Sequence, residues 1–444
     1  MRSWRRMAIM MAVVAACGVA FSQSMPATAP PGRPDVKKLI EEAQVNAAKL
    51  RTADGWKQVG ALESFSDHGG PYPAMPNKPP PRSPNPNVFA FADNDRLVLA
   101  DGKNPIRIVE AKSGKVLSSF GEPLGNGYSG RQMVISRNGQ YMVIVPAIAP
   151  KIWDLQTGNS IGELPKAEKK TYIDAAFLSD GKLAALCEDV STGRMRKSVV
   201  TFALGGNGIV LGKEVGADQN ARSLMVAGSY LAVSAGRSVQ VFDADSLQQV
   251  FATDKCQYMI LFIHAEKAGA TLGAMQVTDS EGKWNNMTPV LLRYAIPDGK
   301  ATKLDEFEFE ELQNNDPNDH RFQAFYTMSP DHATLAVSRH GRVDFYRFTD
   351  GLRVQRIVIG NRYALPQVCF LSANHVLLTS SREHQLMEFD IVKNEKLAVF
   401  PEDNAGAVSP DGKHFASRRD SVPVGENQFV NLPVPLVTLW ERTK

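Results

Sequence analysis

The chain has few cysteines, namely Cys17, Cys187, Cys256 and Cys369 among 444 residues. The last three lie in separate apolar segments, and no regular spacing indicates a disulfide framework. The spacing also excludes a zinc site of the usual kind, because zinc ligands come in pairs two to four residues apart. We therefore predict that these three thiols are small, buried core residues.

Histidine is scarce as well, and no two histidines have the short spacing of a helical or strand-borne metal motif. The eight positions are His68, His264, His320, His332, His340, His375, His384 and His414. Two of them, His332 and His375, occupy a turn position at which other segments have glycine, so we predict turn residues there. A composite metal or quinone site assembled from distant residues is the alternative, although no motif supports it.

Long apolar runs are absent after residue 16, so nothing beyond that point is expected to cross a membrane. Residues 1–6 carry Arg2, Arg5 and Arg6, and residues 7–16 are an unbroken apolar run too short for a span. This pattern predicts a signal peptide at 1–20 and an extracytoplasmic location, in the periplasm or cell envelope. Residues 14–17 resemble the bacterial lipobox, in which Cys17 would be lipidated; free secretion after cleavage at Ala20 is the alternative.

The chain has no excess charge of either sign outside this leader. Lysine and arginine number 50 and aspartate and glutamate 47, and three of the arginines lie in the first six residues. A neutral mature protein has no global field to attract nucleic acid or anionic lipid. We expect no nucleic-acid partner, and membrane attachment only through an N-terminal lipid.

No catalytic motif in the sequence stands in the structural context that it requires. Residues 125–130 match the G-x-G-x-x-G pattern, but they precede an apolar strand, whereas a dinucleotide site needs the pattern between a strand and a helix. Residues 127–130 are likewise not the nucleophile elbow of a hydrolase. We expect no enzyme activity and no cofactor, with inter-strand turns as the role of these glycines.

A pattern of strand, tight turn, strand and third strand recurs at intervals of roughly 40 residues. Its clearest copy spans residues 133–158, with Gly139 at the turn and Trp153-Asp154 at the end of the third strand. Gly181 and Gly412 mark equivalent turns. This period is typical of a β-propeller. We predict an all-β fold of eight four-stranded blades, or seven if the first or fifth unit is misread.

The last repeat is incomplete, because the chain stops four residues after Trp440. Residues 56–65 form a spare strand at the other end, and we predict that they supply the missing outer strand and close the ring. The expected organisation is a Pro-rich tether with a short helix at 21–54 and a propeller at 55–444. Residues 69–87 form a Pro-rich loop within the propeller.

These repeats resemble a divergent form of the WD40-repeat β-propeller family over about residues 87–444. The resemblance is carried by aromatic residues and aspartates at the ends of third strands and by Ser-Pro-Asp turns: Trp153-Asp154, Phe242-Asp243, Phe389-Asp390, Leu439-Trp440, Ser329-Pro-Asp331 and Ser409-Pro-Asp-Gly412. It implies a non-catalytic platform for partner proteins. The Gly-His dipeptide that begins an ordinary repeat is absent, so the family's Asp-His-Ser-Trp network is not carried over.

Two insertions are the best candidates for partner contacts. Residues 304–320 combine an alternating acidic and aromatic segment, expected to be an outer strand, with a loop that carries Asp316 and Asp319; a weak Ca²⁺ site or a solvated insertion are the alternatives. Residues 278–286 place Trp284 among polar residues, as in many interface anchors. The predicted function is a monomeric, non-enzymatic scaffold that binds a protein or glycan with the loops of one face. An enzyme (hydrolase, lyase or oxidoreductase) with a site over the central channel is the alternative.

Overall fold

The structure is a computed structural model, and every regular element in the part it describes is a β-strand. The described residues are 51–63, 89–101, 104–123, 132–145, 147–166, 169–191, 195–205, 208–234, 238–253, 258–266, 269–276, 290–306, 325–339, 341–359, 366–380, 385–401, 403–425 and 428–443. Several predicted features lie outside these ranges: the signal peptide with Cys17, the short helix within 21–54, the Pro-rich loop 69–87, the 125–130 glycines and Cys256.

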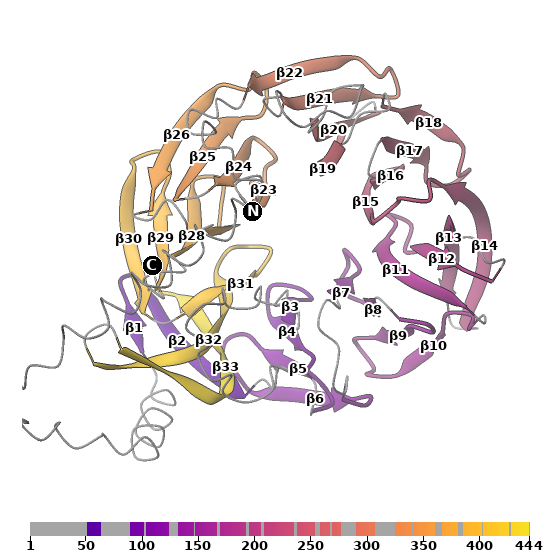
Figure 1. Ribbon diagram of the computed structural model, residues 1–444. Coiled ribbons are helices and arrows are strands. Elements are labelled where there is room, and N and C mark those ends of the chain that lie inside the picture. The colour runs from indigo at the N-terminus through magenta and orange to yellow at the C-terminus, as the bar shows by residue number, and fades with distance from the viewer. Residues whose placement is uncertain are drawn as a thin grey trace, which may run out of the picture.

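Eight antiparallel sheets stand around a central axis, each with its first strand innermost (Figure 1). Blades 1 to 4 consist of β3 Phe89–Phe91, β4 Arg96–Leu99, β5 Ile106–Glu110 and β6 Val116–Phe120; β7 Gln132–Ile135, β8 Tyr141–Val145, β9 Lys151–Asp154 and β10 Ser160–Glu163; β11 Lys170–Phe177, β12 Leu183–Asp189, β13 Arg196–Gly205 and β14 Gly208–Ala217; β15 Ser223–Ala227, β16 Tyr230–Ser234, β17 Val239–Asp243 and β18 Gln249–Ala252.

The remaining blades complete the ring, so the prediction of eight blades is confirmed and the seven-blade alternative is wrong. Blades 5 to 8 consist of β19 Tyr258–Glu266, β20 Gly269–Gln276, β21 Val290–Ile296 and β22 Ala301–Glu306; β23 Phe325–Met328, β24 Thr334–Arg339, β25 Arg342–Arg347 and β26 Arg353–Val358; β27 Gln367–Phe370, β28 His375–Ser380, β29 Gln385–Asp390 and β30 Glu395–Pro401; β31 Asp403–Val408, β32 His414–Gly425, β33 Gln428–Arg442 and β2 Trp56–Glu63.

The hydrophobic core is divided into clusters between neighbouring blades. Successive residues of β12 point alternately to its two sides, so Ala185 packs toward blade 2 while Leu186 packs toward blade 4. This arrangement buries both faces of the inner strands and accounts for their unbroken apolar sequences. Each blade is therefore stabilised mainly by its two neighbours.

The ring is closed by the N-terminal strand, as predicted. β2 pairs with β33 in antiparallel register from Trp56 opposite Arg442 to Glu63 opposite Leu436. A short strand, β1 (Thr52–Ala53), pairs with β2 at the edge of this sheet. The first propeller strand thus begins at Thr52, three residues before the predicted boundary at residue 55.

The repeated turn glycines have a steric role. Gly139, Gly181 and Gly412 all have positive φ values, of 67°, 82° and 69°. A Cβ atom at Gly139 or Gly412 would also overlap a backbone carbonyl of the preceding blade, that of Ala92 or Leu371. Glycine at these two turns therefore permits both the left-handed conformation and the close approach of two blades.

The two histidines predicted to be turn residues differ from each other. His332 has a φ of 57° and takes the glycine position of its turn, as predicted. His375 is wrongly predicted, because it is the first residue of β28 and its ring contacts three charged side chains. β22 (Ala301–Glu306) is the outer strand of blade 5 and overlaps the start of the outer strand predicted in 304–320; the rest of that segment lies outside the described residues.

Candidate functional site

The two faces of the disc differ in the connections they carry. Strand direction alternates within a blade, so connections after first and third strands lie on one face and those after second and fourth strands on the other. On the first face no connection is longer than five residues; we call it the tight-turn face. The other, the long-connection face, receives the strand ends that flank residues 64–88, 277–289 and 307–324.

The residues predicted to contact a partner belong to these long connections. Trp284 lies in the segment between β20 and β21, and Asp316 and Asp319 lie between β22 and β23. All three are outside the described residues. The strands that flank these two segments end on the same face of the disc.

The aromatic residues and aspartates at the ends of third strands have a structural role. Asp154 accepts hydrogen bonds from the backbone N–H groups of Gln156 and Thr157, at 2.8 and 3.0 Å. Asp390 accepts equivalent bonds from the turn that follows it, and the N–H of Lys393 holds the pKa of this carboxyl below its usual value. These carboxylates shape the turn into the outer strand.

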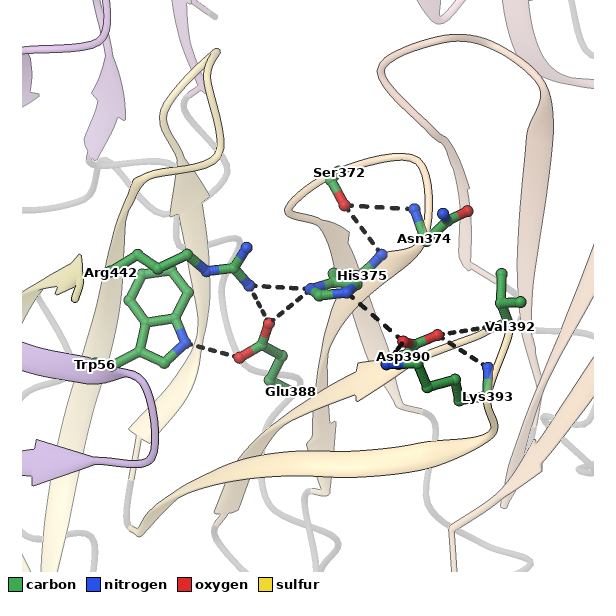
Figure 2. A network of polar contacts seen from close by, with 9 residues as sticks. All are labelled: Trp56, Ser372, Asn374, His375, Glu388, Asp390, Val392, Lys393 and Arg442. Carbon is green, nitrogen blue, oxygen red and sulfur yellow. Dashed lines mark hydrogen bonds and ion pairs between the residues drawn. The ribbon is translucent and has the colours of Figure 1, made fainter. Parts of the chain in front are cut away.

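A buried polar network joins the last strand of the chain, the N-terminal strand and blade 7 (Figure 2). We call Trp56, His375, Glu388, Asp390 and Arg442 the closure network. Glu388 is only 2% exposed and lies at its centre: one oxygen accepts a hydrogen bond from Trp56 Nε1 at 2.7 Å and the other pairs with the Arg442 guanidinium. The Arg442 guanidinium also lies over the Trp56 ring, 5.0 Å from its centroid.

His375 extends this network toward the tight-turn face. Its Nδ1 lies 3.1 Å from both Arg442 Nη2 and Glu388 Oε1, and its Nε2 lies 3.8 Å from Asp390 Oδ2. A ring protonated on Nδ1 donates to Glu388, whereas a ring protonated on Nε2 accepts from Arg442 at Nδ1.

The closure network is a latch between distant segments. Both oxygens of Glu388 and the Trp56 N–H are engaged within the protein, so these groups hold the strands together. Sequence reasoning missed this network. Its one signal was a glutamate inside the otherwise apolar strand segment around Glu388, where a buried charge requires a partner.

Other polar groups connect neighbouring blades. Asp174 of blade 3 accepts a hydrogen bond from the backbone N–H of Leu224 in blade 4, at 2.7 Å. Between blades 5 and 6 the rings of His264 and His332 stack with centroids 4.0 Å apart. Partial burial, and the neighbouring imidazole of His264, lower the pKa of His332 below its usual value.

Of the two cysteines that the structure describes, Cys187 is buried, as the sequence predicted, whereas Cys369 is half-buried. Cys187 and Cys369 are free thiols in β12 and β27. Burial raises the pKa of Cys187 to about 12 and that of Cys369 to about 11. Both thiols stay protonated at neutral pH and are poor nucleophiles.

A small buried polar cluster joins the second and third strands of blade 8. The indole N–H of Trp440 donates to Ser417 Oγ at 3.2 Å, and this hydroxyl lies 2.6 Å from Thr438 Oγ1.

Among the described residues no three His, Cys, Asp or Glu side chains gather as metal ligands would. No helix in the same part of the chain is long and apolar enough to cross a membrane.

The ring of eight four-stranded blades defines the chain as an eight-bladed β-propeller. The chain is similar to the computationally designed Ika8 protein, with 12% identity over 80% of this chain and 95% of that chain and a TM-score of 0.53. It is also similar to the dihydro-heme d1 dehydrogenase NirN in complex with DHE, with 12% identity over 85% of this chain and 77% of that chain and a TM-score of 0.52. The β-propeller domain of Myceliophteria thermophila Cps50 (Swd1) aligns at 11% identity over 72% of this chain and 97% of that chain, with a TM-score of 0.44. At these identities the similarity concerns the fold alone. No protein-family model and no curated protein matches the chain.

Proposed function

We propose that this chain is a non-enzymatic β-propeller scaffold that binds a protein partner through its long-connection face, outside the cytoplasm. The observation that carries the proposal is the difference between the two faces. Connections on one face are at most five residues long, whereas the strand ends on the other face flank the three longest connections, 64–88, 277–289 and 307–324. Long connections on a rigid scaffold are where proteins place their binding residues.

The polar groups that join strands and blades support a scaffold in preference to an enzyme. Glu388, Arg442, Asp174 and the His264–His332 pair all link strands or blades to one another. The two described thiols are protonated at neutral pH. These groups stabilise the disc, and the proposal therefore assigns binding to the connections.

Substitution of Trp284 by alanine tests the binding face. With the mature chain as bait in an envelope extract, we expect Trp284→Ala to reduce recovery of a wild-type partner by about tenfold or more, as at interface hot spots. Leu352→Ala is the matched control, because Leu352 is an apolar residue on the tight-turn face with 59% of its surface exposed. Equal loss with both variants, or a stoichiometric bound metal in place of any partner, would contradict the proposal.

Cys17→Ser tests the location of the protein. If Cys17 is lipidated, the wild-type chain fractionates with membranes and the variant moves to the soluble fraction, since a single polar substitution removes the anchor. Fractionation of the intact cells followed by immunoblotting measures this directly. If the wild-type chain is found in the soluble fraction outside the cytoplasm, it is secreted and not lipidated. If the wild-type chain is found in the cytoplasm, the proposed location is refuted.

A further inference from the structure

Two histidine rings meet at the boundary between blades 5 and 6. His264 lies near the end of β19, the innermost strand of blade 5, and His332 lies in the turn between β23 and β24 of blade 6 (Figure 1). The ring centroids are 4.0 Å apart and the ring planes are within 21° of parallel. His264 is half-buried and His332 is exposed. The rings therefore stack at a place on the tight-turn face that protons can reach from the solvent.

The turn that carries His332 does not by itself require a histidine. The N–H of His332 donates to the carbonyl of Ser329 at 2.8 Å, just as the N–H of Gly139 donates to that of Ser136 at 2.8 Å in blade 2. At this position the backbone is left-handed, with a φ of 57° at His332, and glycine adopts that conformation at the lowest cost. The turn thus gives no reason for the side chain, whereas the contact with His264 does.

This boundary differs from the one between blades 1 and 2. There the glycine turn approaches the backbone of the neighbouring blade directly, because a Cβ atom at Gly139 would lie 2.3 Å from the carbonyl oxygen of Ala92. Between blades 5 and 6 the turn instead makes its contact through two imidazole rings. A contact between two backbones does not change with pH, but a contact between two imidazoles does.

The charged groups around the pair oppose a second proton. Partial burial lowers the pKa of His332, and the charges of His264 and of Arg137, in the turn between β7 and β8, lower it further. The Asp331 carboxylate acts in the opposite direction. A hydrogen bond from the Ser329 hydroxyl holds the pKa of Asp331 below its usual value, so this carboxylate is ionised throughout the range in which histidine titrates. Asp331 therefore provides no additional negative charge as the pH falls.

The effect on stability has a definite sign. Because the folded protein protonates His332 less readily than the unfolded chain does, the free energy of unfolding falls as the pH decreases from about 6.5, the usual pKa of histidine. Well above this pH the pair contributes no pH dependence. Two unit charges about 4 Å apart repel each other even in water, by an energy that corresponds to about fivefold in an equilibrium constant.

We propose that the stack of His264 on His332 is a pH-sensitive contact between blades 5 and 6. The stack holds the two blades together while at most one of the rings is protonated, and it opens when both rings carry a proton. The inference goes beyond the proposed scaffold function and does not depend on it.

Amide hydrogen exchange of the mature chain, measured by mass spectrometry at about pH 7.5 and about pH 5.0, tests this proposal. After correction for the intrinsic pH dependence of exchange, we expect the protection of residues 325–339 to be about fivefold or more lower at the acid pH. Residues 177–189, which contain the equivalent turn of blade 3 and no histidine, are the internal reference and should change by less than about twofold. An equal loss in the two segments would indicate a general effect of acid and overturn the proposal.

His264→Phe separates charge from stacking, because phenylalanine keeps a ring beside His332 but cannot be protonated. We expect this variant to have the protection of the wild type at the neutral pH and to retain it at the acid pH. His332→Asn removes the other ring, and asparagine tolerates the left-handed turn, so this variant keeps the test decisive if the first fails to fold. A loss of protection at acid pH that persists in the folded variants, or a wild-type chain that shows no loss, contradicts the proposal.

Histidine ¹³C NMR gives a second measurement on the same proteins. The resonance that is missing from the spectrum of His332→Asn identifies His332. We expect His332 to titrate at a higher pH in His264→Phe than in the wild type, because the neighbouring positive charge is gone. An unchanged titration would show that the two rings do not interact through their charges and would also overturn the proposal.

Discussion

A chain that begins at residue 64 is expected to lose the cooperative thermal transition of the mature protein. The truncation removes β1 and β2 and leaves the edge of β33 unpaired. It also removes Trp56, which is 2% exposed and packs edge-on against Phe415, with ring centroids 4.8 Å apart. Losing one such buried aromatic side chain costs about 3–5 kcal/mol. Domains are typically stable by only about 5–15 kcal/mol, so we expect the loss of all the contacts of this strand to remove most of that stability.

A chain that begins at Arg51 is the matched control for this truncation. It lacks the leader and the tether but keeps β1 and β2, so its melting temperature should equal that of the mature protein. Circular dichroism and size-exclusion chromatography of the two chains measure the difference. If the chain that begins at residue 64 melted like the control, the N-terminal strand would not be needed to close the ring.

Glu388→Ala is expected to lower the free energy of unfolding by about 2–4 kcal/mol, because it leaves the Arg442 guanidinium and the Trp56 N–H without their shared acceptor. The lower end of this range reflects the 24% exposure of the Arg442 side chain, which water can partly solvate. Chemical denaturation measures the change, and the fluorescence of Trp56 reports on the same region.

Glu395→Ala is the control for Glu388→Ala, since Glu395 begins the next strand of the same blade with an exposed side chain. We expect a change of less than about 0.5 kcal/mol there. A double-mutant cycle with Arg442→Met isolates the Glu388–Arg442 pair, and a coupling energy near zero would show that the pair does not act as a latch.

The fold was predictable from the sequence because the propeller repeats its local signals. Gly139 and Gly412 mark turns whose backbone only glycine suits, and the aspartates Asp154 and Asp390 mark the following turn in each blade. The strand at Trp56–Glu63 was predictable by elimination, because the last repeat lacked its fourth strand. These signals act within a single repeat or follow from the count of strands.

The sites were less predictable because they depend on contacts between repeats. The closure network unites Trp56 with Glu388, 332 positions apart, and no local pattern relates the two. The close approach of Gly121 to the ring of Trp153 likewise follows from the packing of blade 1 on blade 2. The role of His375 was misjudged because it occupies a turn position in the repeat but adopts strand conformation in the structure.

The pairing of the first strand with the last has a consequence for how the protein is made. The N–H of Thr443 donates to the carbonyl of Gly55, in the turn between β1 and β2. This early hairpin can therefore be held in place only after the chain has been synthesised as far as Thr443. Bringing such distant segments together costs about 5 kcal/mol of chain entropy, which blades 1 to 7 reduce by folding into an arc beforehand. A nascent chain that emerges N-terminus first therefore keeps the edge of β2 unpaired until β33 has been synthesised.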